Sequence, residues 1–95
     1  MFFVYILKCS DGTYYIGHTD DIETRIALHN SGQIEGYTSK RLPVEVVYIQ
    51  DFQTRDEAFT IERQIKGWSR RKKEALILHD WNKLQEYSKR YKNFE

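Results

Sequence analysis

The chain has little cysteine, which cross-links small proteins, and little proline or glycine, which mark turns and loops. Cys9 is the single cysteine among 95 residues, so no disulfide can form within the chain and no cluster of thiolates can hold a metal. A small domain without disulfides is typical of a reducing compartment, and we therefore expect a cytoplasmic protein. Pro43 is the only proline, and the 5 glycines form no glycine-rich loop of the kind that cradles phosphates.

Long hydrophobic runs are missing as well. No stretch approaches the roughly 18 apolar residues that a membrane span requires. The amino-terminal residues lack the basic region and the small-residue cleavage site of a signal peptide. With 40% hydrophobic and 31% charged residues, the composition is that of an ordinary globular protein, which we expect to be a monomer without a membrane partner.

The chain as a whole has almost no net charge, but one segment has a clear excess of positive charge. The net charge is only +1, yet residues 51–95 carry eleven basic and eight acidic side chains, whereas residues 1–50 carry four and six. Between Arg63 and Lys73 there are six basic residues and no acidic one. Such a block attracts phosphates over about 8–10 Å, although a solvated helix face explains a basic run equally well.

Three segments have the composition of strands, with β-branched and aromatic residues in succession. They lie at residues 2–9, 13–19 and 44–52. The turn signal Ser10-Asp11-Gly12 joins the first two into an antiparallel hairpin, and the polar stretch 33–43 is expected to be a loop.

Helices are expected at residues 22–30, from 55 to a stop at Gly67 or Ser69, at 70–78 and at 81–91. Thr54 and Glu57 have the spacing of a capping box before the second of these. The order β-β-α-β-α-α-α predicts an α+β fold in which helices cover a small three-stranded antiparallel sheet. We expect residues 1–80 to form the domain and residues 81–95 a helical extension that packs on it or trails from it.

Four residues near the hairpin could carry chemistry. Tyr5 and Tyr15 lie on neighbouring strands, where alternation can put both on one face, although a packed aromatic pair would give the same pattern. Arg25 and His29 are four apart on the first helix and share a face. A guanidinium there can neutralise a phosphate and an imidazole can relay a proton, but such a pair is more often a solvated helix edge.

Glu62 is the only acidic residue between Ala58 and Lys73, and it flanks the apolar stripe of its helix. A carboxylate at such a boundary is costly unless it is paired or bound to a cation. Lys66, four residues further on, is the structural partner, and a single Mg²⁺ completed by waters and a phosphate oxygen is the functional one. The sequence leaves both open.

Taken in order, these residues resemble the GIY-YIG nuclease superfamily. Phe3-Val4-Tyr5 stands where that family has Gly-Ile-Tyr, and Tyr15-Ile16-Gly17 matches the second motif. The helix segment 24–30 is similar to the family's helix with its arginine and histidine, and Glu62 occupies the place of the metal-binding glutamate. The likeness covers about residues 2–78 and is closest to small stand-alone bacterial members without an assigned substrate.

The resemblance implies a mechanism for phosphodiester hydrolysis. Tyr5 would be the general base, as a phenolate or through a water, and Tyr15 would orient the water or the phosphate. Arg25 would neutralise developing negative charge, His29 would support the proton transfer or the phosphate, and Glu62 would hold one Mg²⁺ or Mn²⁺ ion. Because a tyrosine normally has a pKa near 10, Tyr5 would need help from nearby positive charge, such as Arg25 or the metal.

Further residues are expected to hold nucleic acid through phosphate contacts and stacking. They are His18, Lys66, Trp68, Arg70, Arg71, Lys72 and Lys73. His18 stands where repair-type members of the family carry a lysine, and a neutral histidine supplies less positive charge at pH 7.

We therefore predict a divalent-metal-dependent endonuclease that acts on DNA, with RNA left open, in repair or recombination. Because so small a chain leaves little surface for reading bases, we expect shape-led specificity or a partner protein that delivers the target. The first alternative is a nucleic-acid-binding module of the same fold with weak or no catalysis. The second is a protein-interaction adaptor that uses the aromatic surface.

Overall fold

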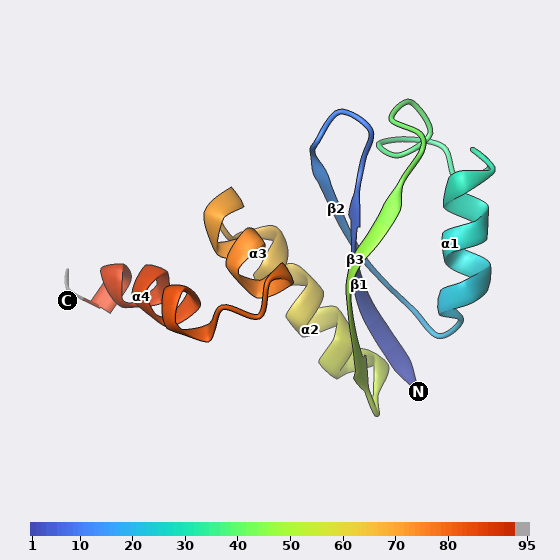
Figure 1. Ribbon diagram of the computed structural model, residues 1–95. Coiled ribbons are helices and arrows are strands. Elements are labelled where there is room, and N and C mark those ends of the chain that lie inside the picture. Colours follow the sequence, from blue (N-terminus) through green and yellow to red (C-terminus); the bar gives the residue numbers. More distant parts are fainter. Residues whose placement is uncertain (93–95) are drawn as a thin grey trace.

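The computed structural model describes residues 1–92 and arranges three strands and four helices as Figure 1 shows. The strands are β1 (Phe2–Lys8), β2 (Tyr14–Thr19) and β3 (Glu45–Phe52). The helices are α1 (Ile22–Asn30), α2 (Arg55–Lys66), α3 (Arg70–Ile77) and α4 (Trp81–Lys92). Each predicted element is present with ends within a residue or two, and the predicted α+β fold is confirmed. The last three residues of the predicted extension, 93–95, lie outside the described residues.

The sheet has the order β2-β1-β3, and both pairings are antiparallel. The central strand β1 is apolar on both faces because helices and loops cover both of them. Tyr5 lies opposite Gly17 on β2 and opposite Ile49 on β3. The pairing of β1 with β3 shifts between Ile6 and Leu7, and β1 places its side chains alternately on the two faces.

One face of the sheet carries the main hydrophobic core and lies against α2 and α3 (Figure 1). Its buried members are Val4, Ile6, Ile16, Tyr48, Ala58, Ile65 and Leu76. The other face carries a smaller cluster, which α1 and the loop between α1 and β3 cover. Its buried members are Tyr5, Leu7, Cys9 and Val44. The two faces therefore present different residues of the same strands to different helices.

Local signals end and begin the helices as the sequence predicts. The capping box of α2 is formed, since Thr54 Oγ1 accepts from the Glu57 amide at 3.2 Å and a Glu57 carboxylate oxygen accepts from the Thr54 amide at 3.2 Å. Both candidate stops are used, with Gly67 closing α2 and Ser69 capping α3. After α3 the backbone takes a left-handed turn at His79, with φ of 55°, a conformation that glycine adopts most easily.

The helix α4 packs on α3 and extends away from the sheet (Figure 1). Leu84 of α4 lies against the main core, and the Arg71 guanidinium of α3 lies 4.2 Å from the centre of the Tyr87 ring. The division of the chain at residue 80 stays a prediction.

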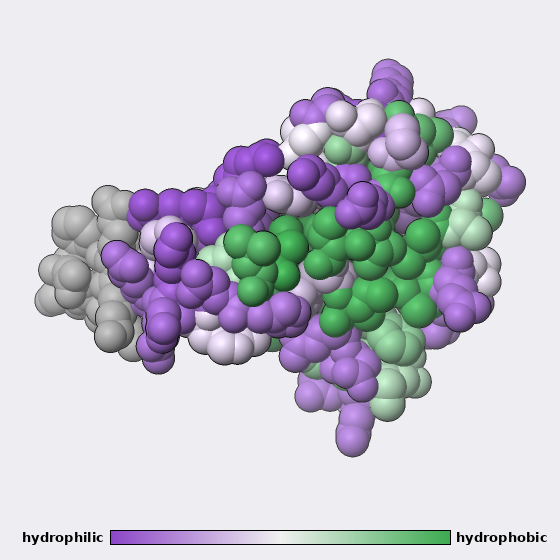
Figure 2. Space-filling model, in the orientation of Figure 1, coloured by the Kyte–Doolittle hydropathy of each residue, from purple (hydrophilic) through white to green (hydrophobic). Residues whose placement is uncertain are grey.

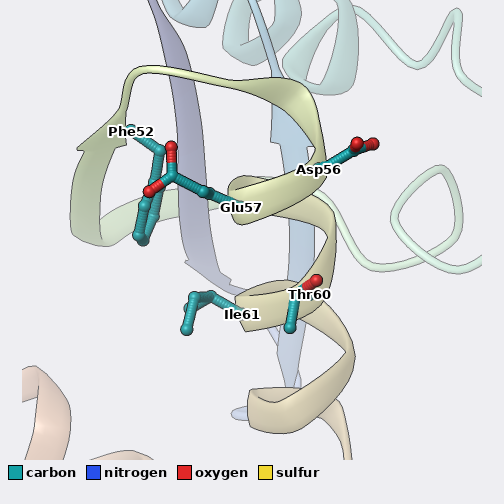
Figure 3. Close-up of a pocket in the computed structure, with 5 residues that line it drawn as sticks. All are labelled: Phe52, Asp56, Glu57, Thr60 and Ile61. Carbon is teal, nitrogen blue, oxygen red and sulfur yellow. The ribbon is translucent and has the colours of Figure 1, made fainter.

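Apolar side chains also reach the surface of the described part of the chain. Figure 2 shows hydrophobic residues gathered across the middle of one face, and the exposed apolar residues include Ile49 on β3 and Leu78 after α3. A shallow pocket of about 360 Å³ lies between the end of β3 and α2, with Phe52 and Ile61 as its apolar lining (Figure 3). Among residues 1–92, no helix combines the length and the apolar character that crossing a bilayer requires.

Candidate active site

The centre of the candidate site is the phenol of Tyr5, which lies across the backbone of β2 at Gly17. Tyr5 is only 2% exposed. A Cβ atom added at Gly17 would lie 2.5 Å from the Tyr5 hydroxyl oxygen and 2.7 Å from its Cζ atom. Only glycine leaves room for the ring there, so the glycine of the Tyr-Ile-Gly motif serves the tyrosine of the other strand.

The Tyr5 hydroxyl belongs to a buried hydrogen-bonded chain of three side chains. His29 Nε2 lies 3.0 Å from the Tyr5 hydroxyl oxygen, and His29 Nδ1 lies 2.8 Å from Thr38 Oγ1. His29 and Thr38 are each 1% exposed. The helix α1 supplies His29 and the following loop supplies Thr38, so these hydrogen bonds join three separate parts of the sequence.

Aromatic rings extend this cluster towards the surface. The Tyr15 ring centre lies 5.1 Å from that of His29 and 6.3 Å from that of Tyr5. The predicted placement of the two tyrosines on one sheet face is therefore observed. Tyr37, in the loop after α1, lies 6.3 Å from Tyr15 between ring centres and is 40% exposed.

The surroundings shift the pKa values of both Tyr5 and His29. Burial raises the pKa of Tyr5 far above its usual value near 10, Tyr15 and Glu62 add to the rise, and the positive charge of Arg25 opposes it. Burial lowers the pKa of His29, and Arg25 lowers it further. The expectation that Arg25 would help Tyr5 to ionise therefore has the right sign, but burial outweighs it. The free protein carries a neutral phenol beside a neutral imidazole at pH 7.

Glu62 is buried on the opposite face of the sheet and is fully paired. One carboxylate oxygen lies 2.5 Å from His18 Nδ1, and the other lies 2.8 Å from Lys66 Nζ. Burial acts to raise the pKa of Glu62, but hydrogen bonds from Lys66 and His18 and their charges hold it below its ordinary value. The carboxylate is thus ionised, and Lys66, the structural partner foreseen from the sequence, is present together with a second one.

The two faces meet at the edge strand β2. Tyr15 and Gly17 face the Tyr5 cluster, whereas His18, the next residue, faces α2 and reaches Glu62. Glu62 is near enough to Tyr5 to raise its pKa. Tyr5, Tyr15 and His29 are therefore in direct contact, whereas Arg25 and Glu62 act on Tyr5 through their charges.

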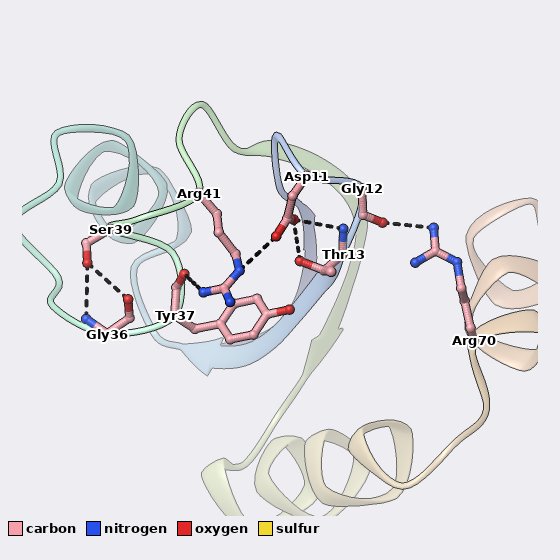
Figure 4. Close-up of polar contacts among 8 residues, drawn as sticks. All are labelled: Asp11, Gly12, Thr13, Gly36, Tyr37, Ser39, Arg41 and Arg70. Carbon is pink, nitrogen blue, oxygen red and sulfur yellow. Dashed lines mark hydrogen bonds and ion pairs between the residues drawn. The ribbon is translucent and has the colours of Figure 1, made fainter.

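Basic side chains between Arg63 and Lys73 make contacts within the protein that the sequence did not predict. Arg70 donates to the Gly12 carbonyl at 2.8 Å (Figure 4) and lies over the Tyr14 ring, with 4.8 Å between its guanidinium carbon and the ring centre. The Lys72 ammonium lies 4.2 Å from the centre of the Trp68 ring, which packs against the main core. These side chains fix α3 to the hairpin and to the core.

Two residues of the cluster were not singled out from the sequence. Thr38 and Tyr37 lie in a polar loop, where no periodicity marks which side chains point inward. The only signal for Tyr37 was an aromatic residue within a polar segment, and none distinguished Thr38 from the neighbouring serine. In the part of the chain that the structure describes, no three His, Cys, Asp or Glu side chains lie together. A metal ion here would therefore depend on Glu62 with waters and a phosphate oxygen.

A small antiparallel sheet with a tyrosine–histidine pair on one face and an ionised glutamate on the other defines a GIY-YIG type of domain. The GIY-YIG catalytic domain family matches residues 1–75, and the chain belongs to this family, which is associated with nuclease-type activity. The resemblance seen in the sequence is thereby confirmed.

Relatives in bacteria and archaea are similar over most of their length. A UPF0213 protein of Staphylococcus saprophyticus is 49% identical over 75 residues, which cover 79% of this chain and 92% of the relative. A UPF0213 protein of Halobacterium salinarum is 46% identical over 77 residues, which cover 81% of this chain and all of the relative. The solution structure of a UPF0213 protein from Bacillus halodurans is 44% identical with a TM-score of 0.54, covering 81% of this chain and 83% of that chain.

Proposed function

We infer that the protein is a divalent-metal-dependent endonuclease that hydrolyses phosphodiester bonds in DNA, in repair or recombination. One observation carries the proposal, namely the buried Thr38–His29–Tyr5 chain of hydrogen bonds. A buried tyrosine hydroxyl needs a hydrogen-bond partner in any case, and here that partner is an imidazole, which can take up a proton and whose second nitrogen is fixed by a buried threonine. Family membership supports the nuclease class, and the metal and the DNA substrate are part of the proposal.

The hydrogen-bonded chain supplies a path for a proton. A neutral histidine has one donor and one acceptor nitrogen. When Nδ1–H donates to Thr38 Oγ1, Nε2 accepts from the Tyr5 hydroxyl. As an attacking water loses its proton to the Tyr5 oxygen, the Tyr5 proton passes to His29. Tyr5 therefore acts as a base without ever being a free phenolate, which its raised pKa disfavours.

The remaining steps balance around the phosphate. The water oxygen forms a bond to phosphorus, the bond to the leaving oxygen breaks, and that oxygen takes a proton from solvent. His29, whose pKa is lowered, then releases its extra proton through Tyr5 to solvent, which restores the neutral pair. Arg25 lies close enough to shift the pKa values of Tyr5 and His29, and its guanidinium neutralises the charge that develops on the phosphate. Tyr15 borders the same space with its ring against His29 and orients the water or the phosphate.

Glu62 fits the role of a single carboxylate ligand to Mg²⁺ or Mn²⁺. Mg²⁺ is commonly bound by one or two carboxylates together with waters and substrate phosphates, and Glu62 is held ionised. The Lys66 side chain is 53% exposed, so it can leave one carboxylate oxygen to an incoming cation. When bound, the ion would stabilise negative charge on the scissile phosphate.

The test is Mg²⁺-dependent nicking of supercoiled and branched DNA. We expect the wild type to cleave and Tyr5→Phe to lose about 10²-fold or more of the rate, since Phe cannot pass a proton. Glu62→Ala should lose metal-dependent cleavage while DNA binding persists. The matched control is Tyr48→Phe, which removes the hydroxyl of a buried tyrosine on the other sheet face and should leave the rate unchanged. Equal rates for Tyr5→Phe and wild type would refute the mechanism.

The second candidate is a nucleic-acid-binding module without turnover, and the pairing of Glu62 favours it. Both carboxylate oxygens already have partners, Lys66 Nζ and His18 Nδ1, so the residue is satisfied without a metal ion. This candidate predicts DNA binding without nicking at any Mg²⁺ or Mn²⁺ concentration. Binding should then weaken as salt rises and when Arg71 or Lys73 is changed to alanine.

A further inference from the structure

The loop between α1 and β3 holds an arginine in a fixed position beside the candidate site. Arg41 Nε donates to Asp11 Oδ2 at 2.9 Å, and its Nη1 donates to the Tyr37 carbonyl at 2.9 Å. The guanidinium carbon lies 3.9 Å from the centre of the Tyr37 ring (Figure 4). Asp11 is itself fixed, because it accepts from the amide and the hydroxyl of Thr13. The cation is therefore oriented before any ligand arrives.

Tyr37 connects this arginine to the buried hydrogen-bonded chain. Its ring lies 6.3 Å from that of Tyr15, which contacts His29. Thr38, the next residue in the chain, is the hydrogen-bond partner of His29. The loop after α1 therefore contacts the buried His29 through Thr38 and presents the exposed ring of Tyr37 at the surface.

The same loop forms an open pocket of about 660 Å³, a size that suits a nucleotide. It is lined by Glu35, Gly36, Tyr37, Ser39, Lys40 and Arg41. Lys40 is exposed and adds a second cation beside Arg41. Among residues 1–88, whose side chains the structure describes, the Arg41 guanidinium donates through Nε and Nη1 only, so Nη2 can donate to a phosphate oxygen. The exposed Tyr37 ring, the oriented cation of Arg41 and the nearby Lys40 together match the two parts of a nucleotide, its base and its phosphate.

We propose that this pocket is a subsite for the nucleotide that flanks the reacting phosphate, with its base against Tyr37 and its phosphate on Arg41 and Lys40. The inference deepens the proposed function and rests on it for the identity of the ligand. Since a base can reach the ring only when it has left its own duplex stack, the subsite takes a strand with an unpaired nucleotide at that position.

A purely structural role for the Arg41–Tyr37 pair makes a different prediction. If the pair only fixes the loop, removing the Tyr37 ring weakens every ligand alike, whether or not the ligand carries bases. If the ring receives a base, its removal matters only for ligands that have bases. The comparison therefore needs two strands of equal charge and length, one of which lacks bases.

The experiment measures fluorescence anisotropy of the full chain, carrying Tyr5→Phe to prevent cleavage, with a labelled single-stranded oligothymidylate and with an abasic strand of the same length. We expect Tyr37→Ala to weaken binding of the oligothymidylate about tenfold and to leave binding of the abasic strand within about twofold. Tyr37→Phe should retain the affinity for both strands. Trp81→Ala, which removes an exposed aromatic ring on α4, is the matched control and should change neither.

Equal loss for both strands, or no loss for either, overturns the subsite, as does a failure of the oligothymidylate to bind. Far-ultraviolet circular dichroism of Tyr37→Ala excludes unfolding as the cause of a loss. The outcome is separate from that of the nicking assay, because binding is measured without turnover. Base-dependent loss in a chain that never nicks DNA would keep the subsite and remove the enzyme. Nicking without base-dependent loss would do the reverse.

Discussion

At the scale of single residues, the candidate site depends on close packing at one position and on charge pairing at another. Gly17 is needed because the Tyr5 phenol lies over it. Glu62 is tolerated in a buried position because Lys66 and His18 pair with its two carboxylate oxygens. Tyr5, Tyr15 and Gly17 could be recognised from their motif and from strand alternation. The Glu62–His18 contact could not, since its members are 44 positions apart on a helix and a strand and no local pattern relates them.

Because the Tyr5 ring lies so close to Gly17, adding a single methyl group at this position should have a large effect on stability. We expect Gly17→Ala to lower the free energy of unfolding by about 1–3 kcal/mol, because the Cβ atom would displace the Tyr5 ring. Gly67→Ala is the control, since its Cβ would meet only backbone oxygens at 3.5 and 3.9 Å. That change should be neutral or stabilising by up to about 1 kcal/mol. Urea denaturation measures both, and equal stability of the two variants would contradict the packing described.

The pairing of Glu62 predicts how stability changes with pH. Because its pKa in the folded state lies below the ordinary 4.5, the ionised carboxylate stabilises the fold above that pH. This stabilisation is lost as the pH falls through the lower folded-state value. We expect Glu62→Gln to cost about 1–3 kcal/mol at pH 7 and the difference from wild type to shrink below pH 4.5.

The measurement is urea unfolding at several pH values in the presence of a chelator. Glu23→Gln, at an exposed position of α1, is the control and should stay within about 0.5 kcal/mol of wild type throughout. A gap between Glu62→Gln and wild type that persists unchanged to pH 3 would show that ionisation of Glu62 does not stabilise the fold.

At the scale of elements, local signals were sufficient for nearly all boundaries. The Asp11-Gly12 turn, the capping box at Thr54 and the stops at Gly67 and Ser69 each specify an end within a few residues of sequence. The loop at 33–43 was correctly expected to lack strands and helices, but its contents were not foreseen. Thr38 is buried there and Tyr37 joins the aromatic cluster because of distant partners, which no local pattern reports.

The capping box of α2 predicts a measurable contribution to stability. We expect Thr54→Ala to lower the free energy of unfolding by about 1 kcal/mol, because it leaves the Glu57 amide without its acceptor. Thr60→Ala, at an exposed position within the same helix, should be neutral or slightly stabilising because alanine is the better helix former. Thermal unfolding compares the two, and a Thr60→Ala loss as large as that of Thr54→Ala would argue against the cap.

At the scale of the whole molecule, the alignments with relatives cover 79–81% of this chain. The Halobacterium salinarum relative is matched over its whole length by 77 aligned residues, so the family's fold does not need a helix in the place of α4. In this chain α4 still packs on α3 and brings Leu84 to the core. We therefore expect α4 to contribute to stability, since Tyr5, His29, Thr38 and Glu62 all lie on other parts of the chain.

Removing residues 81–95 tests this division. We expect the shortened chain to fold with a lower Tm, because Leu84 and the Arg71–Tyr87 contact are lost. The Tyr5–His29 contact should persist, and two-dimensional NMR of the imidazole resonances reports it directly. Leu84→Ala in the full chain is the milder companion variant and should lower Tm in the same direction. A shortened chain with disordered imidazole resonances would mean that α4 supports the site.

The placement of Tyr5 on the central strand has a consequence for synthesis of the chain on the ribosome. Its partners are contributed by His29, then by Thr38 and finally by the charge of Glu62. A nascent chain that has emerged only as far as the hairpin holds the phenol but none of the groups that accept its proton. Any chemistry that depends on this arrangement therefore waits until α2 has been translated and has packed against the sheet.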